Sequence, residues 1–254
     1  MRLLDRLVIL FLNLCLLALA ILAPALALAK SPAFYSRTLR ATGIYESEGV
    51  RTPIRYIGGK SGAVARFTDA QLDAITAHII DYLFGDTEEF ALVLDGVELN
   101  GRAKDGVSVF GDAAIAHMKD VKALMRLAGG VAIASAAFLP FLFLYLYKRR
   151  SARRIALRYT LILYAAILLL AALFLLISYS HSGGDFANTL WNDLHRLFFP
   201  FRPEKVEGSF FNDALTSILT VPFFMSAVLR VVAVLLAVLA AWLVTVILFR
   251  RRAK

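Results

Sequence analysis

The chain has 254 residues, of which 59% are hydrophobic, and its mean hydropathy is +0.69. This composition is more apolar than that of soluble globular proteins, so it predicts an integral membrane protein. The net charge of +9 does not indicate nucleic-acid binding, because twelve of the 28 basic residues lie at the ends of apolar runs, where only Asp5 opposes them. The single cysteine, Cys15, lies within an apolar run, which excludes a disulfide framework and a cysteine metal cluster.

The first element is an apolar run over residues 7–29, which is about long enough to span a membrane. We therefore assign residues 1–29 to a first transmembrane helix. The run ends in Ala-Leu-Ala before Lys30, so a cleaved signal peptide is the alternative. The length of the run favours a retained anchor.

Residues 30–125 differ in composition from the rest of the chain. They hold acidic and basic residues in similar numbers and no spanning run, which predicts a small folded α+β cap. Alternating, β-favouring pieces over residues 35–56 predict extended structure. The glycine-rich residues 58–62 lack the spacing of a phosphate-binding loop, and we interpret them as a turn.

A helix is predicted to start at Thr68, where Thr68 and Gln71 have the spacing of a capping box, and to continue towards Gly85. His78 lies off the apolar stripe of this helix, and we expect it to be solvated. Asp95-Gly96 lies between apolar residues 90–94 and 97–99, which predicts a β-hairpin.

One more strand is predicted over residues 107–110. A helix is then predicted from Asp112, running through His117 into the second apolar run.

Three further apolar runs follow, over residues 127–147, 157–179 and 223–249. The loop 148–158 and the tail 250–252 between and after these runs are strongly basic, which predicts that both are cytoplasmic. Both termini are then cytoplasmic, and the cap and the loop 181–222 lie outside. The predicted fold class is an α-helical integral membrane protein with four transmembrane helices and a small α+β extracytoplasmic cap, and residues 126–254 form helices two to four.

The outer loop contains an aromatic stretch, residues 190–201, around His195. Its aromatic residues are Trp191, Phe198, Phe199 and Phe201. On a helix, Trp191, His195 and Phe198 share one face. Such a helix fits a membrane interface, where aromatic rings form a belt and the histidine is a polar neighbour.

A second histidine, His117, precedes the second apolar run. Asp120 lies three residues further on, so on a helix the carboxylate can contact the imidazole and raise its basicity. The two histidines can therefore converge where the cap meets the outer leaflet, although each can also be structural. The sequence has no His-Glu-x-x-His, Gly-x-Ser-x-Gly or Ser-x-x-Lys pattern, so it predicts no metal site and no standard serine nucleophile.

Three motifs resemble those of one family. Residues 117–122 are similar to a His-Met-x-Asp-Val-Lys motif, and residues 194–199 are similar to a Phe-His-x-x-Phe-Phe motif. Residues 213–215, followed by 222–224, are similar to an Asp-x-Leu … Pro-x-Phe-Phe pattern. The chain resembles the bacterial membrane lipoprotein intramolecular transacylases over nearly its whole length.

The resemblance implies an acyltransferase in the bacterial cytoplasmic membrane that uses no cofactor. It would move an acyl chain within a diacylated lipoprotein, from the sn-2 glyceryl ester to the amine of the N-terminal cysteine. The partners would be this lipoprotein and membrane lipids, with no nucleic acid. The resemblance implies two catalytic histidines, His117 and His195. The residues it implies as supporting are Asp120, Lys122 and Asp213, and those expected to line an acyl-chain pocket are Trp191, Phe198, Phe199 and Phe201.

We assign His117, oriented by Asp120, as the base and His195 as the acid, and leave the reverse order open. Two other functions stay open at this point. One is a non-catalytic lipid-binding or scaffold membrane protein in which both histidines are structural. The other is a lipid hydrolase that uses the same pair of histidines on water.

Overall fold

The computed structural model describes residues 3–45, 54–56, 63–180, 182–199 and 214–251. It divides into two compact units. The membrane unit comprises residues 1–26, 127–193 and 228–254, and the α+β unit comprises residues 27–126 and 194–227. The predicted domain boundaries after residues 29 and 125 stay a prediction.

Among the described residues, four helices are long and apolar enough to cross a membrane: α1 (Leu3–Ala29), α4 (Asp112–Lys148), α5 (Arg150–Ser180) and α9 (Val221–Arg251). Each contains one of the four apolar runs. The predicted four transmembrane helices are therefore confirmed.

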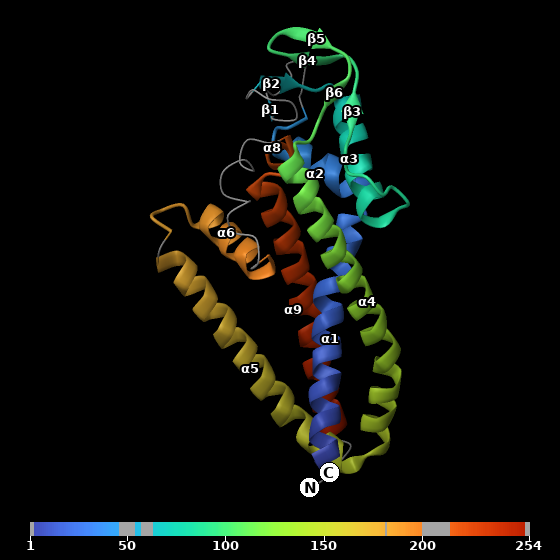
Figure 1. The fold of residues 1–254 in the computed structure, drawn as a ribbon. Helices are drawn as coiled ribbons and strands as arrows, with labels where there is room; N and C mark the ends of the chain where they lie inside the picture. The colour runs from blue at the N-terminus through green and yellow to red at the C-terminus, as the bar shows by residue number, and fades with distance from the viewer. Residues whose placement is uncertain (1–2, 46–53, 57–62, 181, 200–213, 252–254) are drawn as a thin grey trace. The chain divides into compact units, whose positions relative to one another are not determined.

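In the membrane unit, α1 packs beside α9 and the second half of α4 (Figure 1). Ile9 and Leu12 of α1 are buried in one cluster with Trp242 of α9. A buried hydrogen bond also joins α1 to α9: the Trp242 indole Nε1 donates to Asn13 Oδ1 at 2.9 Å. Asn13 Nδ2 donates in turn to the Ile9 carbonyl at 2.8 Å, so both polar groups of this buried amide are bonded.

Helix α5 joins the membrane unit through its first turns and leans away from α1 further along (Figure 1). Ala152, Ala156 and Thr160 are fully buried at four-residue spacing, which lets the helices approach closely. The buried carboxylate of Asp5 accepts hydrogen bonds there from the Tyr145 hydroxyl at 2.7 Å and the Ser151 hydroxyl at 2.9 Å. These bonds connect the starts of α1 and α5 with the end of α4.

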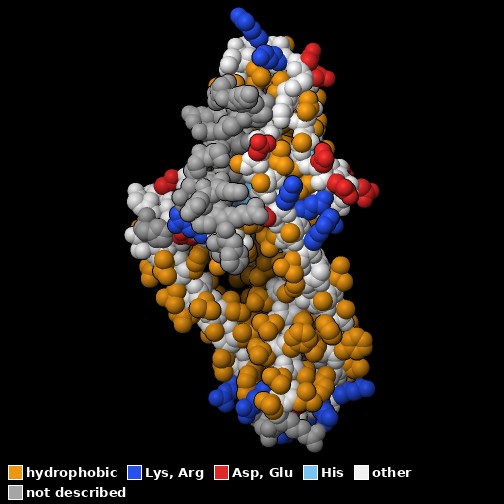
Figure 2. Space-filling view, viewed as in Figure 1, with side chains coloured by type: hydrophobic (Ala, Val, Ile, Leu, Met, Phe, Trp, Pro, Cys, Tyr) orange, Lys and Arg blue, Asp and Glu red, His pale blue; other side chains and the backbone are white. Residues whose placement is uncertain are grey.

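Lysine and arginine side chains gather at one end of the membrane unit, and hydrophobic side chains cover the helices beside them (Figure 2). Exposed basic residues at the helix ends there include Arg6, Lys148, Arg149, Arg150, Arg154, Arg158, Arg250 and Arg251. This distribution is typical of a helical membrane protein with an apolar belt and a basic rim.

The described residues of the α+β unit form two antiparallel sheets. The larger has the order β1 (Ile54–Tyr56), β2 (Ala63–Arg66), β4 (Val97–Leu99) and β5 (Arg102–Lys104) (Figure 1). The smaller pairs β3 (Val93–Leu94) with β6 (Val107–Ser108).

The predicted hairpin at Asp95-Gly96 is wrong, because β3 and β4 enter different sheets. The Asp95 carboxylate accepts a hydrogen bond from the Gly106 N–H, and the Asp105 carboxylate accepts one from the Gly96 N–H, each at 2.8 Å. The hairpin that forms joins β4 to β5 through Asn100-Gly101, whose φ angles are +49° and +81°. Asn-Gly is the preferred pair for a two-residue turn with two positive φ angles, so a hairpin signal was present five residues further on.

Residues 35–56 were expected to be extended, but helix α2 (Pro32–Ala41) occupies the start of this range. Ser31 caps the helix by accepting a hydrogen bond from the Phe34 N–H, and Pro32 supplies the first helical residue. Phe34, Tyr35 and Leu39 are buried on one face, a helical spacing that the alternating interpretation missed.

The predicted helix at Thr68 is confirmed as α3 (Asp69–Phe84). Thr68 and Gln71 form a reciprocal capping box, with bonds of 3.1 and 2.8 Å. His78 is half-buried rather than solvated, because its Nε2 lies 3.1 Å from the Phe90 carbonyl oxygen and its ring faces the Phe90 ring.

A single hydrophobic core of the α+β unit holds the start of α4 in place. Ala114 and Met118 of α4 are buried in this core with Phe90 and Phe110. The same core includes helix α8 (Ala214–Ile218) and Phe223 at the start of α9. The core therefore fixes the rotation of α4 about its own axis.

Candidate active site

His117 lies in the second turn of α4, at the edge of the face that the core covers. Ala114 and Met118 point into the core, and at 100° per residue His117 and Asp120 follow on one side of this buried stripe. His117 is consequently half-buried rather than fully exposed. The sequence predicted this helix and this placement of His117 and Asp120 at three-residue spacing.

His195 lies in the last turn of helix α6 (Phe186–Phe198). Its carbonyl oxygen accepts a hydrogen bond from the Phe199 N–H at 2.8 Å, which extends the helical hydrogen-bonding pattern by one residue. His195 and Phe199 are therefore neighbours on the same face of the chain at this point, and both are half-buried.

The structure brings these three rings together within the α+β unit. The centroids of the His117 and His195 imidazoles lie 5.8 Å apart, with 26° between the ring planes. The Phe199 ring lies edge-on to His117, with centroids 4.8 Å apart, and is tilted against His195 at 5.8 Å. Two residues 78 positions apart in the chain are thus in ring contact, which supports the predicted convergence of the histidines.

His117 lies outside the part of α4 that can span a membrane, because four charged residues follow it before the apolar stretch begins at Leu127. They are Lys119, Asp120, Lys122 and Arg126. The pKa of the His117 imidazole is lowered from 6.5 to about 4, chiefly by burial and secondly by the nearby His195, while the Asp120 carboxylate acts in the opposite direction. His117 is therefore neutral at pH 7 and able to accept a proton.

Lys122 lies on the other side of the buried stripe of α4 from His117. Its ammonium donates a hydrogen bond to the Thr87 carbonyl at 2.8 Å and lies 4.3 Å from the centroid of the Tyr82 ring. From the sequence motif, Lys122 was predicted to support the two catalytic histidines. Its contacts instead attach α4 to α3 and the segment after it.

The four predicted aromatic residues do not share one environment. Phe199 contacts both histidines, whereas Phe198 is 56% exposed. Trp191 is half-buried on α6 within the membrane unit. Phe201 and the supporting residue Asp213 lie outside the described residues.

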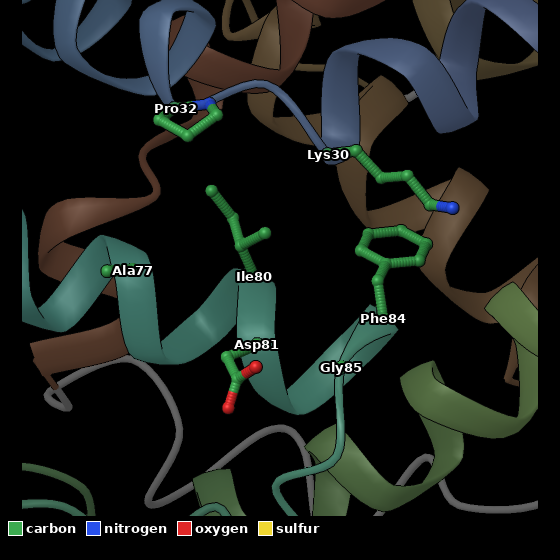
Figure 3. A pocket seen from close by; sticks show the side chains of 7 residues that line it. All are labelled: Lys30, Pro32, Ala77, Ile80, Asp81, Phe84 and Gly85. Atoms are coloured by element: carbon green, nitrogen blue, oxygen red, sulfur yellow. The ribbon is translucent and has the colours of Figure 1, made fainter.

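A shallow cavity of about 400 Å³ lies elsewhere in the α+β unit (Figure 3). It is lined by Lys30, Pro32, Ala77, Ile80, Asp81, Phe84 and Gly85. Ile80 and Phe84 point from α3 towards Pro32 and Lys30 in the close-up, and the Lys30 ammonium lies 5.0 Å from the centroid of the Phe84 ring. None of the residues predicted for the site lines this cavity. Within the described part of the chain, no group of three or more His, Cys, Asp or Glu residues could hold a metal ion.

Comparison with known proteins decides the family. The model of the lipoprotein intramolecular transacylase family, Lit, matches residues 7–205, more than three-quarters of the chain. The chain belongs to this family. The predicted class of enzyme, an acyltransferase, is confirmed by membership of the Lit family.

A solved structure of a Lit protein has a similar fold. The membrane integral lipoprotein intramolecular transacylase Lit from Bacillus cereus is similar with a TM-score of 0.62 over 98% of each chain, at 15% sequence identity. At this identity the likeness concerns the fold, and it confirms the predicted helical membrane fold with a small strand-containing region. No curated protein sequence matches the chain.

Proposed function

We propose that this protein moves an acyl chain within a bacterial lipoprotein, from the sn-2 glyceryl ester to the α-amine of the N-terminal cysteine. The observation that carries the proposal is the ring contact between His117 and His195, with centroids 5.8 Å apart. Membership of the Lit family supports a lipoprotein as the substrate. We further propose that no cofactor takes part.

The chemistry requires one proton to leave the amine and one proton to reach the glyceryl oxygen. An α-amine has a pKa of about 8, so at pH 7 about a tenth of it is the neutral amine, whose lone pair can attack the ester carbonyl. The attacking nitrogen becomes acidic as its bond to the carbonyl carbon forms, and His117, neutral at pH 7, is suited to accept the proton that this nitrogen then loses. The C–N amide bond then forms, the ester C–O bond breaks, and the His195 imidazolium donates a proton to the leaving oxygen.

The product is an isomer of the substrate and forms without water, since the acyl chain moves from oxygen to nitrogen and the glyceryl hydroxyl is regenerated. The amine and the ester belong to one molecule, so the site has only to hold them in the geometry of attack, which lowers the entropic part of the barrier. Assigning the base role to His195 and the acid role to His117 breaks and forms the same bonds. We place His117 as the base because its neutral form persists at pH 7.

Asp120 supports this assignment through its charge. Its carboxylate favours the imidazolium of His117, and so stabilises the proton that the base takes up. We propose that Trp191, Phe198 and Phe201 contact the acyl chains. The roles of Lys122 and Asp213 in the reaction stay predictions.

The orientation that fits this function has the α+β unit on the outer side of the cytoplasmic membrane, where lipoproteins are anchored. The basic rim of the membrane unit supports this orientation, because cytoplasmic loops carry an excess of Lys and Arg. Both termini and the loop 148–158 would then be cytoplasmic.

The proposal is tested by mass spectrometry of lipoprotein N-termini from cells that express the protein and from cells that lack it. Expression should convert the diacylglyceryl cysteine into a cysteine with one acyl chain on nitrogen and one on glycerol, with no change in total mass. Tandem fragmentation distinguishes the two isomers. Free fatty acid and a monoacyl product would identify a hydrolase, and unchanged lipoproteins would favour a scaffold.

A further inference from the structure

An aromatic belt at the membrane surface does not explain where the Phe199 ring lies. Its ring is edge-on to His117, with centroids 4.8 Å apart, and is tilted against His195 at 5.8 Å. Its neighbours Leu197 and Phe198 are 63% and 56% exposed, whereas Phe199 is half-buried. The contacts of Phe199 are therefore with the two imidazoles rather than with the surface around them.

We propose that Phe199 is a positioning residue, which holds the imidazoles of His117 and His195 against each other and keeps water from the face of His117. This inference rests on the proposed acyl transfer. It gives Phe199 a role separate from the acyl-chain contact that the family motif implies.

The backbone makes this role mechanically possible. The Phe199 N–H donates a hydrogen bond to the His195 carbonyl at 2.8 Å, so the two residues are fixed to each other at the end of α6. His117 is fixed separately, because Ala114 and Met118 hold α4 in the core. The Phe199 ring is an apolar contact that bridges these two supports, and an edge-to-face arrangement of aromatic rings favours one orientation of the His117 ring.

The electrostatics of His117 give this role a measurable signature. The charged or titratable groups acting on His117 are His195 from α6 and Asp120 from α4 itself, and burial is the largest cause of its lowered pKa. Phe199 carries no net charge, so its ring affects the pKa of His117 mainly by excluding water. Removing the ring should raise the pKa of His117 while both charged neighbours stay in place.

Water exclusion also affects which product forms. If water reaches the ester carbonyl, it can attack in place of the amine, with His117 accepting a proton from water. The C–O bond then breaks to give a free fatty acid and the glyceryl hydroxyl. Loss of Phe199 should therefore shift the products from transfer towards hydrolysis.

The test uses the full chain in lipid nanodiscs, with ¹⁵N-labelled histidine, and a synthetic diacylated lipopeptide as the substrate. Phe199→Ala should raise the pKa of His117 towards 6.5, slow transfer at least tenfold and increase the share of free fatty acid. Phe199→Leu keeps apolar bulk, so it should restore part of each effect. Leu197→Ala is the matched control, because Leu197 is exposed in the same turn, and it should leave all three measurements unchanged.

Two outcomes separate this inference from the proposed function. If His117→Ala abolishes transfer but Phe199→Ala leaves the His117 titration and the products as in Leu197→Ala, the positioning role is wrong and the acyl transfer stands. If His117→Ala and His195→Ala both keep full transfer, the proposed mechanism itself is wrong. If Phe199→Ala does not fold, Phe199→Leu is measured in its place. A His117 titration and a product ratio in Phe199→Leu that both equal those of the unmodified protein would refute the inference.

Discussion

The coupling between the two histidines predicts how the protonation of His117 responds to its neighbour. In the folded protein the pKa of His117 is lowered from 6.5 to about 4, first by burial and then by His195. Replacing His195 with Gln removes the second cause and keeps a side chain of similar length. The pKa of His117 should therefore rise, but by less than burial lowers it, because burial is the larger cause.

Asp120 predicts a change of opposite sign. Its carboxylate raises the pKa of His117, so Asp120→Asn should lower this pKa below that of the unmodified protein. The two variants together separate an electrostatic effect from a general loosening of the site, which would move the pKa towards 6.5 in both.

The same shift predicts how the stability of the folded protein depends on pH. The unfolded imidazole binds a proton near pH 6.5, whereas the folded one remains neutral down to about pH 4. Stability is therefore lost as the pH falls from about 6.5 to about 4, and one pKa unit corresponds to about 1.4 kcal/mol. The loss attributable to His117 is at most about 3.5 kcal/mol.

The assay is a ¹⁵N NMR titration of histidine-labelled protein in nanodiscs. The chain has four histidines, so single substitutions assign the imidazole signals. His78→Gln is the matched control, because His78 is half-buried in the same unit and bonds to the Phe90 carbonyl instead of the pair. A His117 that titrates near 6.5 in the unmodified protein, or whose pKa falls in His195→Gln, would refute this account of the pair.

Three further predictions concern the fold. Asn13→Leu leaves the buried Trp242 indole N–H without its acceptor, so the protein should lose about 1–3 kcal/mol, measured as a lower melting temperature in detergent, with no loss if the bond is unimportant. Thr68→Ala removes the cap of α3 and should cost about 1 kcal/mol in the same melt, while Thr68→Ser should keep most of the stability. With Cys15 replaced by Ser, a cysteine introduced by Lys148→Cys should resist a membrane-impermeant reagent in intact cells, and rapid labelling would reverse the proposed topology.

The elements that sequence predicted correctly are those whose signal is local. An apolar run of more than 20 residues can be satisfied in lipid only as a helix, so the four spans follow from composition alone. The capping box at Thr68 is equally local, because both of its bonds join residues three positions apart. Neither depends on contacts with distant parts of the chain.

The errors arise where tertiary contacts decide. Asp95-Gly96 does form a turn, but the two strands beside it find partners in different sheets, and pairing across sheets cannot be read from a dipeptide. His78 seemed solvated from its position on the helix, yet the chain after α3 returns and places the Phe90 carbonyl against it. In both cases the deciding partner is 11 or more residues away in the sequence.

The candidate site lies between these extremes. The spacing of His117 to Asp120 and of His195 to Phe199 is local and was available from the sequence. The edge-on contact of Phe199 with His117 joins α6 to α4 and depends on how the core orients α4, so no pattern predicts it. A shared motif does not mean a shared site. Lys122 belongs to the motif of His117, but it lies on the other side of the buried stripe of α4 and donates a hydrogen bond to the Thr87 carbonyl.

The most direct test of the central claim follows one acyl chain through the reaction in nanodiscs. A diacylated lipopeptide carries a heavy isotope only in its sn-2 acyl chain, and the products are fragmented by mass spectrometry. We predict that the label moves to the cysteine nitrogen in the unmodified protein. We also predict that His117→Ala and His195→Ala each abolish this transfer, and that the double variant loses no more than either single variant, because residues acting as a unit are not additive. Label recovered as free fatty acid from the unmodified protein, or losses in the single variants that add up in the double variant, would contradict the account.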